Sequence, residues 1–261
     1  MIRLMGNTPF LKNPPCFVAK VPVRIDRGNY VVKTAETFFE VSQALALRYQ
    51  VFHREFQNKV IPFGSDWDDL DLLADHLIIK HKETDEVIGT YRLISNLFSK
   101  NFYSVQEFQC EQFIFNPETK VELSRAAIDS RYRNGITISL LWKGITQYIQ
   151  KTSAAFLFGC SSINTMEINS VFHLLGMLSE MNVALSDFSI APQSSYKRKN
   201  RVHFVNQKKV NHLPPLLLSY LRAGAKVSLM PAWDYDFHCV DLFTLLETKN
   251  LKTNLKSRLC R

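Results

Sequence analysis

Four charged residues lie inside segments whose hydrophobic pattern predicts burial: Arg48, Arg92, Glu122 and Arg125. A buried charge is costly unless it has a partner of opposite sign, and connected networks of buried charges gather at functional sites. The pattern indicates either a functional charge cluster or a set of structural ion pairs. In both cases an anionic partner must lie close to each arginine.

The elements that carry these charges are predicted from periodicity. Apolar residues recur at helical spacing over residues 36–56, and Arg48 falls within that stripe. Arg92 lies in a predicted strand at 87–94, and Glu122 and Arg125 lie in another at 121–128. Strict alternation places Glu122 and Arg125 on opposite faces, so their convergence on one site requires a β-bulge.

The rest of the chain alternates strands and helices. Strand-like runs predict strands at 30–33, 76–81, 156–159, 183–190 and 227–230. Helical patterns predict helices at 138–149, 164–181, 213–221 and 240–246. No internal repeat is found. The sequence therefore predicts an α/β domain.

The composition is that of a globular protein from a reducing compartment. The 261 residues are 46% hydrophobic, which is sufficient for a core. The five cysteines are scattered and form no CxxC pair, which argues against disulfides and a zinc ribbon. No signal-peptide core or membrane-spanning apolar run is found, so we expect a cytoplasmic protein, soluble or peripheral on the inner face of the membrane.

The net charge of +8 is concentrated in two segments, 192–212 and 248–261, which hold eleven Lys and Arg and no acidic residue. They suggest a division into an extension at 1–35, a domain at 36–247 with a basic insertion at 192–212, and a basic tail at 248–261. Such segments attract acidic proteins, anionic lipid or nucleic acid, and a solvated charged loop is the alternative.

Several short motifs resemble a known family. Arg48-Tyr-Gln-Val-Phe52, Asp75-His76, Gly89-Thr-Tyr-Arg92-Leu and Glu122-Leu-Ser-Arg125 resemble motifs of acyl-homoserine-lactone synthases, which belong to the GNAT superfamily. The later segments 213–225 and 231–237 resemble more closely the related ornithine-lipid N-acyltransferases. The resemblance extends from about Thr34 to Leu246.

The resemblance implies a GNAT-like fold: a mixed, mainly antiparallel twisted sheet flanked by helices and splayed between the strands near Val121 and Phe156. It also implies an acyl carrier protein as the donor, with phosphopantetheine (or coenzyme A) carrying a 3-hydroxyacyl or similar chain, and no resident cofactor. The acceptor would be the α-amine of a basic amino acid such as ornithine, and the product a lyso-aminolipid.

The resemblance also suggests roles for single residues. Glu122 would accept the proton of the attacking amine, and the arginines 48, 92 and 125 would hold the acidic loop or bind the acceptor carboxylate. Backbone NH groups at the bulge would face the developing oxyanion. The predicted substrate-binding residues are Phe52, Asp75, His76, Ser124, Arg133, Gly135 and Trp233. For Trp233, packing in the core is the alternative.

The loop that holds the coenzyme A pyrophosphate in GNAT enzymes is only partly present, as Arg131-Tyr-Arg-Asn-Gly135-Ile-Thr137. Its NH groups and the following helix N-terminus still suit one phosphate, which favours a carrier-protein donor. Metal-ligand spacing is absent from the histidines, and we expect no metal site. Cys160 is interpreted as a core thiol.

Two alternatives stay open at this point. One is an acyl-homoserine-lactone-type autoinducer synthase, against which the C-terminal motifs argue. The other is a non-catalytic basic module that binds membrane or nucleic acid. Few aromatic residues interleave with the basic residues of 192–212, so nucleic acid is not the expected partner.

Overall fold

A computed structural model describes residues 17–60, 64–199 and 209–251 of the chain. Its strands are β1 Arg24–Arg27, β2 Tyr30–Thr34, β3 Asp75–His81, β4 Val87–Ser95, β5 Phe108–Gln109, β6 Lys120–Ile128, β7 Phe156–Ile163, β8 Ala191–Pro192, β9 Lys226–Val227, β10 Ala232–Asp234 and β11 Cys239–Glu247. Its α-helices are α1 Phe38–Arg48, α2 Ser104–Glu107, α3 Glu111–Ile114, α4 Gly135–Thr152, α5 Ile168–Glu180 and α6 Pro215–Ala223. Short helices of other types are a π-helix at Tyr49–Phe56 and 3-10 turns at Asp69–Leu73, Ser130–Tyr132, Ser194–Tyr196 and Thr248–Asn250.

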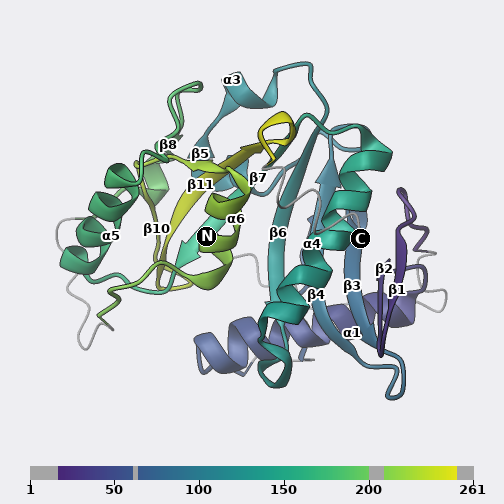
Figure 1. Cartoon of the computed structure of the whole chain (residues 1–261). Helices are drawn as coiled ribbons and strands as arrows, with labels where there is room; N and C mark the ends of the chain where they lie inside the picture. Colours follow the sequence, from purple (N-terminus) through teal and green to yellow (C-terminus); the bar gives the residue numbers. More distant parts are fainter. Residues whose placement is uncertain (1–16, 61–63, 200–208, 252–261) are drawn as a thin grey trace.

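The main sheet runs in the order β1-β2-β3-β4-β6-β7-β11-β10, with β9 paired to β11 (Figure 1). Its neighbouring strands are antiparallel except for β6 and β7, which are parallel. The predicted mixed, mainly antiparallel sheet is confirmed.

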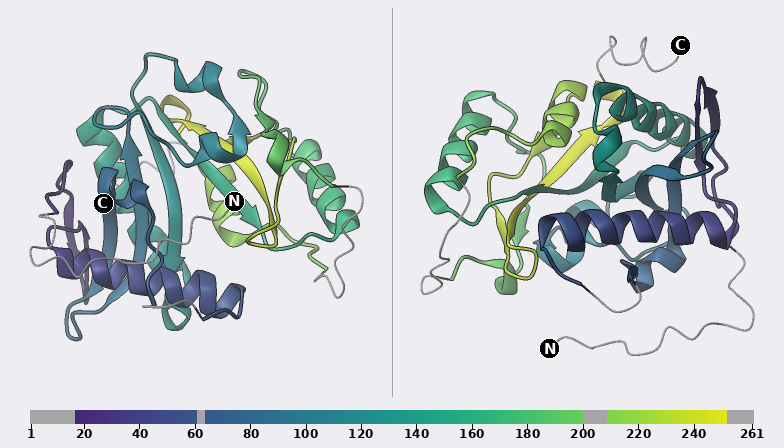
Figure 2. Two further views of the ribbon diagram at one scale, coloured as in Figure 1. Left: turned by 180° about the vertical axis from the view of Figure 1, so that it is seen from behind. Right: turned by 90° about the horizontal axis from the view of Figure 1, so that it is seen from below.

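Helices cover both faces of this sheet, as the sequence predicted. Alternation along β3 directs Leu77 and Ile79 into the core beneath α4, whereas Ile78 packs with α1 on the opposite face. Figure 2 shows α1 and α4 on the two sides of the sheet when it is viewed from below. Within the described ranges, no helix is long and apolar enough to cross a membrane.

The helix that carries Arg48 has a defined beginning and an unusual end. The Thr37 side chain accepts a hydrogen bond from the Glu40 amide at its N-terminus. After Arg48 the chain continues as the π-helix Tyr49–Phe56, so the predicted helix over 36–56 consists of two helical types. Wider π-turns change the direction in which Phe52 and His53 point, and such segments are frequent at functional sites.

β6 and β7 separate after a short paired stretch. Their parallel pairing covers only Lys120–Glu122 with Phe156–Phe158. Gly159 follows on β7, and a Cβ atom there would lie 2.2 Å from the Leu123 carbonyl oxygen, so only glycine permits the close approach at the point of divergence. The predicted splay of the sheet near Val121 and Phe156 is present.

Two predicted elements differ from the structure. Residues 240–246, predicted as a helix, belong to the strand β11, which is buried along nearly its whole length. A strand buried on both faces has no alternation, so periodicity cannot separate it from a helix. The predicted strand at 183–190 is reduced to an isolated bridge between Ala184 and Val227.

The N-terminal boundary also differs. Residues Arg24–Thr34 lie within the segment predicted as an extension, yet they form β1 and β2 at one edge of the main sheet. The domain therefore begins earlier than predicted. The basic insertion at 192–212 and the basic tail at 248–261 fall partly outside the described residues, the tail almost entirely.

Candidate active site

The acidic loop after the π-helix binds Arg48. The Nε of Arg48 donates to Asp66 Oδ2 at 2.7 Å, and the Nη1 of Arg48 donates to Asp71 Oδ1 at 2.6 Å. Arg48 is only 1% exposed. Burial opposes ionisation of Asp66, but the hydrogen bond from His53 and the charges of Arg125 and Arg48 outweigh it and lower the pKa of Asp66. The buried arginine thus has the anionic partners that the sequence required.

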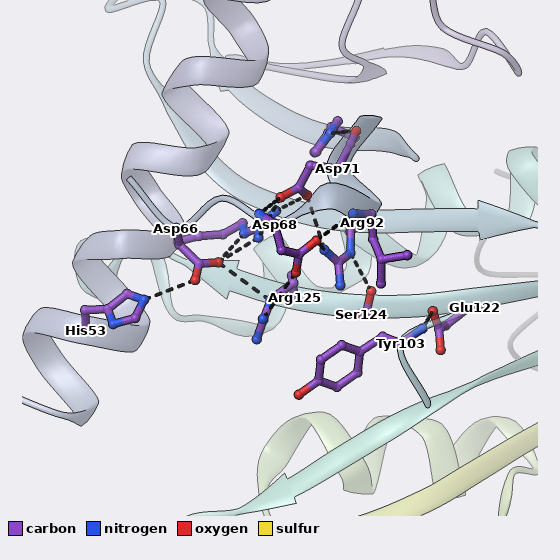
Figure 3. Close-up of polar contacts among 12 residues, drawn as sticks. His53, Asp66, Asp68, Asp71, Arg92, Tyr103, Glu122, Ser124 and Arg125 are labelled. Atoms are coloured by element: carbon purple, nitrogen blue, oxygen red, sulfur yellow. Dashed lines mark hydrogen bonds and ion pairs between the residues drawn. The ribbon is translucent and has the colours of Figure 1, made fainter. Parts of the chain in front are cut away.

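The other two arginines reach the same loop from the sheet (Figure 3). Arg92 Nη1 donates to Asp68 Oδ1 at 2.6 Å, and its Nε donates to Ser124 Oγ at 3.0 Å. Arg125 Nη2 donates to Asp68 Oδ2 at 3.4 Å. Three arginines and three aspartates therefore form one connected network, in which opposite charges offset the cost of burial.

Arg125 reaches this network because β6 has a bulge. Thr90 pairs with Ala127 and Arg92 with Ser124, so β6 has one more residue than β4 between these pairs. Arg125 sits in the bulge with a φ of +55°, in the left-handed region. The bulge required by the sequence argument is present, and it turns the Arg125 guanidinium toward the rings of Tyr103 and Phe237, 5.0 and 5.5 Å from their centroids.

Glu122 lies apart from the arginines. Its carboxylate accepts hydrogen bonds from the backbone of Tyr103 at 2.7 Å and Ser104 at 2.7 Å, and from Ser104 Oγ at 2.6 Å. Within the described ranges it has no hydrogen bond or ion pair with the three arginines. Full burial raises the pKa of Glu122, and the hydrogen bonds from Ser104 and Tyr103 offset part of that rise.

A cavity of about 630 Å³ occupies the splay between β6 and β7. On the face covered by α4 and α6 its lining is apolar, with Leu141, Leu157, Leu216, Tyr220 and Leu246. The opposite face contributes carboxylates and small polar groups, with Glu107, Cys160, Ser162, Asp234 and Asp241. The cavity therefore passes through the sheet from an apolar side to an acidic side.

The N-terminus of α4 opens onto the cavity. Arg133, Asn134 and Gly135 line it there, and the Asn134 side chain caps the helix by accepting from the amides of Ile136 and Thr137. A Cβ atom at Gly135 would meet nothing within 4 Å. A helix N-terminus that borders a cavity suits an anion.

The comparisons with known proteins agree with this geometry. A family model described as an acetyltransferase (GNAT) domain matches residues 47–143. The sequence is 28% identical over 243 residues to the L-ornithine N(alpha)-acyltransferase of Rhizobium meliloti (strain 1021), covering 84% of this chain and 80% of that protein. It is 26% identical over 248 residues to the protein of the same name from Brucella abortus (strain 2308), covering 87% of each.

A solved structure gives the same fold. FeeM, an N-acyl amino acid synthase from uncultured soil microbes, matches with a TM-score of 0.52 at 11% identity, over 86% of this chain and 95% of that chain. The chain is an N-acyltransferase with the GNAT fold. The alternative of a non-catalytic basic module is therefore wrong.

Four of the substrate-binding residues predicted from the sequence line the cavity of this N-acyltransferase: Phe52, Ser124, Arg133 and Gly135. Arg125 lines it as well, whereas Arg48, Arg92 and Glu122 do not. The four charged residues, expected as a functional charge cluster, therefore do not surround one cleft. Arg48 and Arg92 lie behind Arg125 in the ion-pair network, and Glu122 lies beneath the N-terminus of α2.

Three further predicted residues lie away from the cavity of the N-acyltransferase. Asp75 accepts from the backbone of Lys20 at 2.8 Å and from the Tyr148 hydroxyl at 2.8 Å. His76 Nε2 lies 3.2 Å from the Asp71 carbonyl oxygen, and burial lowers the pKa of this imidazole to about 4. Trp233 packs in an apolar cluster with Val240. Their contacts are those of structural residues.

Sequence reasoning missed the acidic side of the cavity. Glu107 is the last residue of a short helix that was not predicted, and Asp241 lies in the strand that was interpreted as a helix. An aspartate flanked by apolar residues in 239–247 was the available signal, because a buried strand rarely carries a charge without a ligand or a partner.

Proposed function

We propose that this enzyme transfers a fatty or 3-hydroxyfatty acyl group from acyl carrier protein to the α-amine of an amino acid such as ornithine, giving a lyso-aminolipid. The observation that carries the proposal is the cavity through the sheet, with an apolar side and an acidic side. It is supported by the similarity to proteins named L-ornithine N(alpha)-acyltransferase. The acyl chain suits the apolar side and a basic acceptor suits the acidic side.

The reaction requires the amine nitrogen to attack the thioester carbonyl carbon, so that a C–N bond forms, the C–S bond breaks and the thiol leaves. The bulge at Arg125 lies beside the cavity, beyond the point where β6 and β7 stop pairing, and it interrupts the pairing of β6 with β4. The interrupted pairing would free backbone groups to face the developing oxyanion. The N-terminus of α4 would hold the phosphate of phosphopantetheine.

The attacking amine must also lose a proton. We propose that Glu122 receives it through the Ser104 hydroxyl. Ser104 Oγ donates to Glu122 at 2.6 Å and lies 3.6 Å from the Cys160 thiol, and Cys160 lines the cavity. The raised pKa of the buried Glu122 carboxyl makes its carboxylate a better proton acceptor than that of an exposed glutamate.

The carrier protein is proposed to dock on the basic insertion. Lys197, Arg198 and Lys199 are exposed in the described part of this segment. Acyl carrier proteins are acidic, so long-range attraction would raise the rate of encounter. Reversal of Lys197 and Arg198 to Glu is expected to raise the KM for acyl carrier protein about tenfold at low salt and to flatten its salt dependence. Lys199 is kept because its Nζ lies 4.5 Å from the centroid of the Tyr235 ring.

Reversal of two exposed lysines outside the basic segments, Lys59 and Lys100, is the matched control. If both double variants change the KM equally, net charge alone is responsible and docking on the insertion is rejected. If neither changes it, the insertion has another task, such as contact with anionic membrane.

The function itself is tested with purified enzyme, L-ornithine and one of two thioester donors, either acylated acyl carrier protein or acyl-coenzyme A. Mass spectrometry should detect an N-acyl-ornithine whose fragments place the acyl group on the α-nitrogen. The initial rates with the two thioesters decide the donor. A lactone product would favour the autoinducer-synthase alternative, and the absence of any acylated amino acid would overturn the proposal.

A further inference from the structure

Glu107 is a buried carboxylate with no partner of its own. It ends α2, is 0% exposed and lines the cavity. Neither of its oxygens has a hydrogen-bond partner among the described residues. The Tyr103 hydroxyl and the Cys160 thiol face it closely enough to favour its ionised form in part, but burial and the charge of Asp241 raise its pKa well above the usual range. An unsatisfied buried carboxylate is costly and requires an explanation.

Two more carboxylates face the same side of the cavity, each held in place by its neighbours. Asp241 Oδ1 accepts from Ser162 Oγ at 2.6 Å, across the β7–β11 pair. Asp234 Oδ1 accepts from the amides of Asp236 and Phe237, both at 2.9 Å. The ligand atoms of Asp234, Cys239 and Asp241 lie within 4.8 Å of one another. These contacts fix the directions of both carboxylates without neutralising them.

The three carboxylates on this side of the cavity have no paired cation within the described residues. Glu107, Asp234 and Asp241 form no ion pair in the part of the chain that the structure describes. The nearest guanidinium, that of Arg125, binds Asp66 and Asp68 in the network behind it. Burial, together with the charge of Asp234, raises the pKa of Asp241 to about 6. A positively charged ligand would stabilise the ionised form of all three groups.

We propose that Glu107, Asp234 and Asp241 bind the side-chain ammonium of the acceptor, so that the enzyme selects amino acids that carry a second amine. This inference rests on the proposed N-acyltransferase function and adds the residues that choose the acceptor. Tyr103 and Phe237 also line the cavity, where their rings can contact the methylene groups between the two amines.

An ammonium ion fits these groups better than a metal ion does. The thiols of Cys160 and Cys239 are buried beside carboxylates, which raises their pKa values well above the usual range and keeps them protonated. A protonated thiol is a poor metal ligand. Asp241 accepts hydrogen bonds from the Ser162 hydroxyl and the Cys239 thiol, one on each oxygen. Each carboxylate oxygen has a second lone pair, so an ammonium with three donors can still bind there.

The test compares L-ornithine with L-norvaline, which has the same carbon chain without the second amine. The readout is the ratio of kcat/KM for the two acceptors in the wild-type enzyme, Glu107→Gln and Asp241→Asn. We expect a wild-type ratio of about 10²- to 10⁴-fold in favour of ornithine, because norvaline lacks the second amine and leaves the buried polar groups unpaired. Each variant should lower this ratio at least tenfold, because kcat/KM for ornithine falls while kcat/KM for norvaline stays the same.

Glu40→Gln is the matched control, because Glu40 is a buried carboxylate that already has a cation, Lys33 Nζ at 3.0 Å. It should leave the acceptor ratio unchanged. Melting temperatures separate binding from folding: loss of an unpaired carboxylate at Glu107 should leave the melting temperature equal or higher, whereas a structural role would lower it.

Each remaining outcome is decisive. If the wild type acylates norvaline as well as ornithine, the ammonium site is rejected while the N-acyltransferase function stands. If no amino acid is acylated, the proposed function itself fails. If titration with Mn²⁺ or Zn²⁺ shows tight binding that Asp241→Asn abolishes, the cluster is a metal site and the proposal is overturned.

Discussion

Two clusters of buried carboxylates lie on either side of Arg125, and they are built on opposite principles. In the loop cluster, Asp66, Asp68 and Asp71 face three arginines, so the charges balance within the protein. In the cavity cluster, Glu107, Asp234 and Asp241 face no arginine or lysine of their own in the described ranges. The charges of the first cluster are balanced within the protein, whereas the charges of the second are balanced only when a cationic ligand binds.

The pKa shifts of the carboxyls also differ between the two clusters. Burial raises the pKa of a carboxyl in both clusters, but the neighbouring arginines reverse the result for Asp66 and Asp68, whose pKa values are lowered. For Glu107, Asp234 and Asp241 no such reversal occurs, and their pKa values are raised. These opposite shifts of the pKa values separate a structural ion-pair network from a site prepared for a cation.

The largest effect on stability is expected from Asp71→Asn. Asp71 is 0% exposed and receives Arg48 Nη1 at 2.6 Å and Arg92 Nη1 at 3.4 Å. Loss of its charge removes one of the two anionic partners of each arginine, while Arg48 keeps Asp66 and Arg92 keeps Asp68. The free energy of unfolding should therefore fall by about 3 kcal/mol, the low end of the range for a broken buried ion pair. Chemical denaturation monitored by circular dichroism measures this difference.

Asp69→Asn provides the control on the same loop, because Asp69 is exposed. It should change the free energy of unfolding by less than about 0.5 kcal/mol. If Asp71→Asn is as stable as Asp69→Asn, the arginines do not depend on the loop and the contrast between the clusters is lost.

Glu122→Gln tests the buried carboxylate that belongs to neither cluster. Glutamine cannot accept the amine proton, so turnover should fall by about 10²- to 10⁴-fold. Three donors from Tyr103 and Ser104 surround this carboxylate, and the amide NH₂ would face one of them. We therefore expect an added loss of stability of about 1–3 kcal/mol, which a melting curve detects.

The pH dependence of turnover separates the two effects in folded protein. If Glu122 is the base, the acidic limb of the profile disappears in the variant. If it only holds Tyr103 and Ser104, the whole curve falls without a change of shape. Ser104→Ala should reproduce the loss of turnover if the proton passes through the Ser104 hydroxyl, and normal turnover in that variant excludes the relay.

The arginine network could be predicted from the sequence because each of its members breaks a local pattern. Arg48 interrupts the apolar stripe of a helix, and Arg92 and Arg125 interrupt apolar strands. The bulge followed from the spacing of Glu122 and Arg125, since an odd separation cannot bring two side chains to one face of a regular strand.

The cavity cluster could not be predicted in the same way. Glu107 lies in a polar segment where a carboxylate is unremarkable, and its burial arises only because α2 and β5 pack against the sheet. Asp241 lies in a strand whose two buried faces resemble a helical pattern. The apolar residues around Asp241 are a local signal for that residue alone, whereas the proximity of Glu107 and Asp241 depends on the tertiary fold.

The pH dependence of acceptor binding gives the smallest and most specific effect. The pKa of Asp241 is raised to about 6, so Asp241 is ionised above that pH and takes up a proton as the pH falls through it. The protonated acid no longer attracts an ammonium, and the KM for ornithine should rise about tenfold from pH 7 to pH 5. Tyr103, Glu107, Arg125, Cys160, Cys239 and Asp234 face the same side of the cavity. The carboxyls of Glu107 and Asp234, whose pKa values are also raised, would titrate in the same direction as Asp241. Protonation of the α-amine also slows the reaction at low pH, but it does so equally for norvaline. The ratio of the two KM values therefore isolates the cavity carboxylates. A ratio that stays constant between pH 5 and pH 7 would show that the second amine does not meet these groups. In Asp241→Asn the pH dependence of the ratio should become weaker, because one of the titrating carboxylates has been removed.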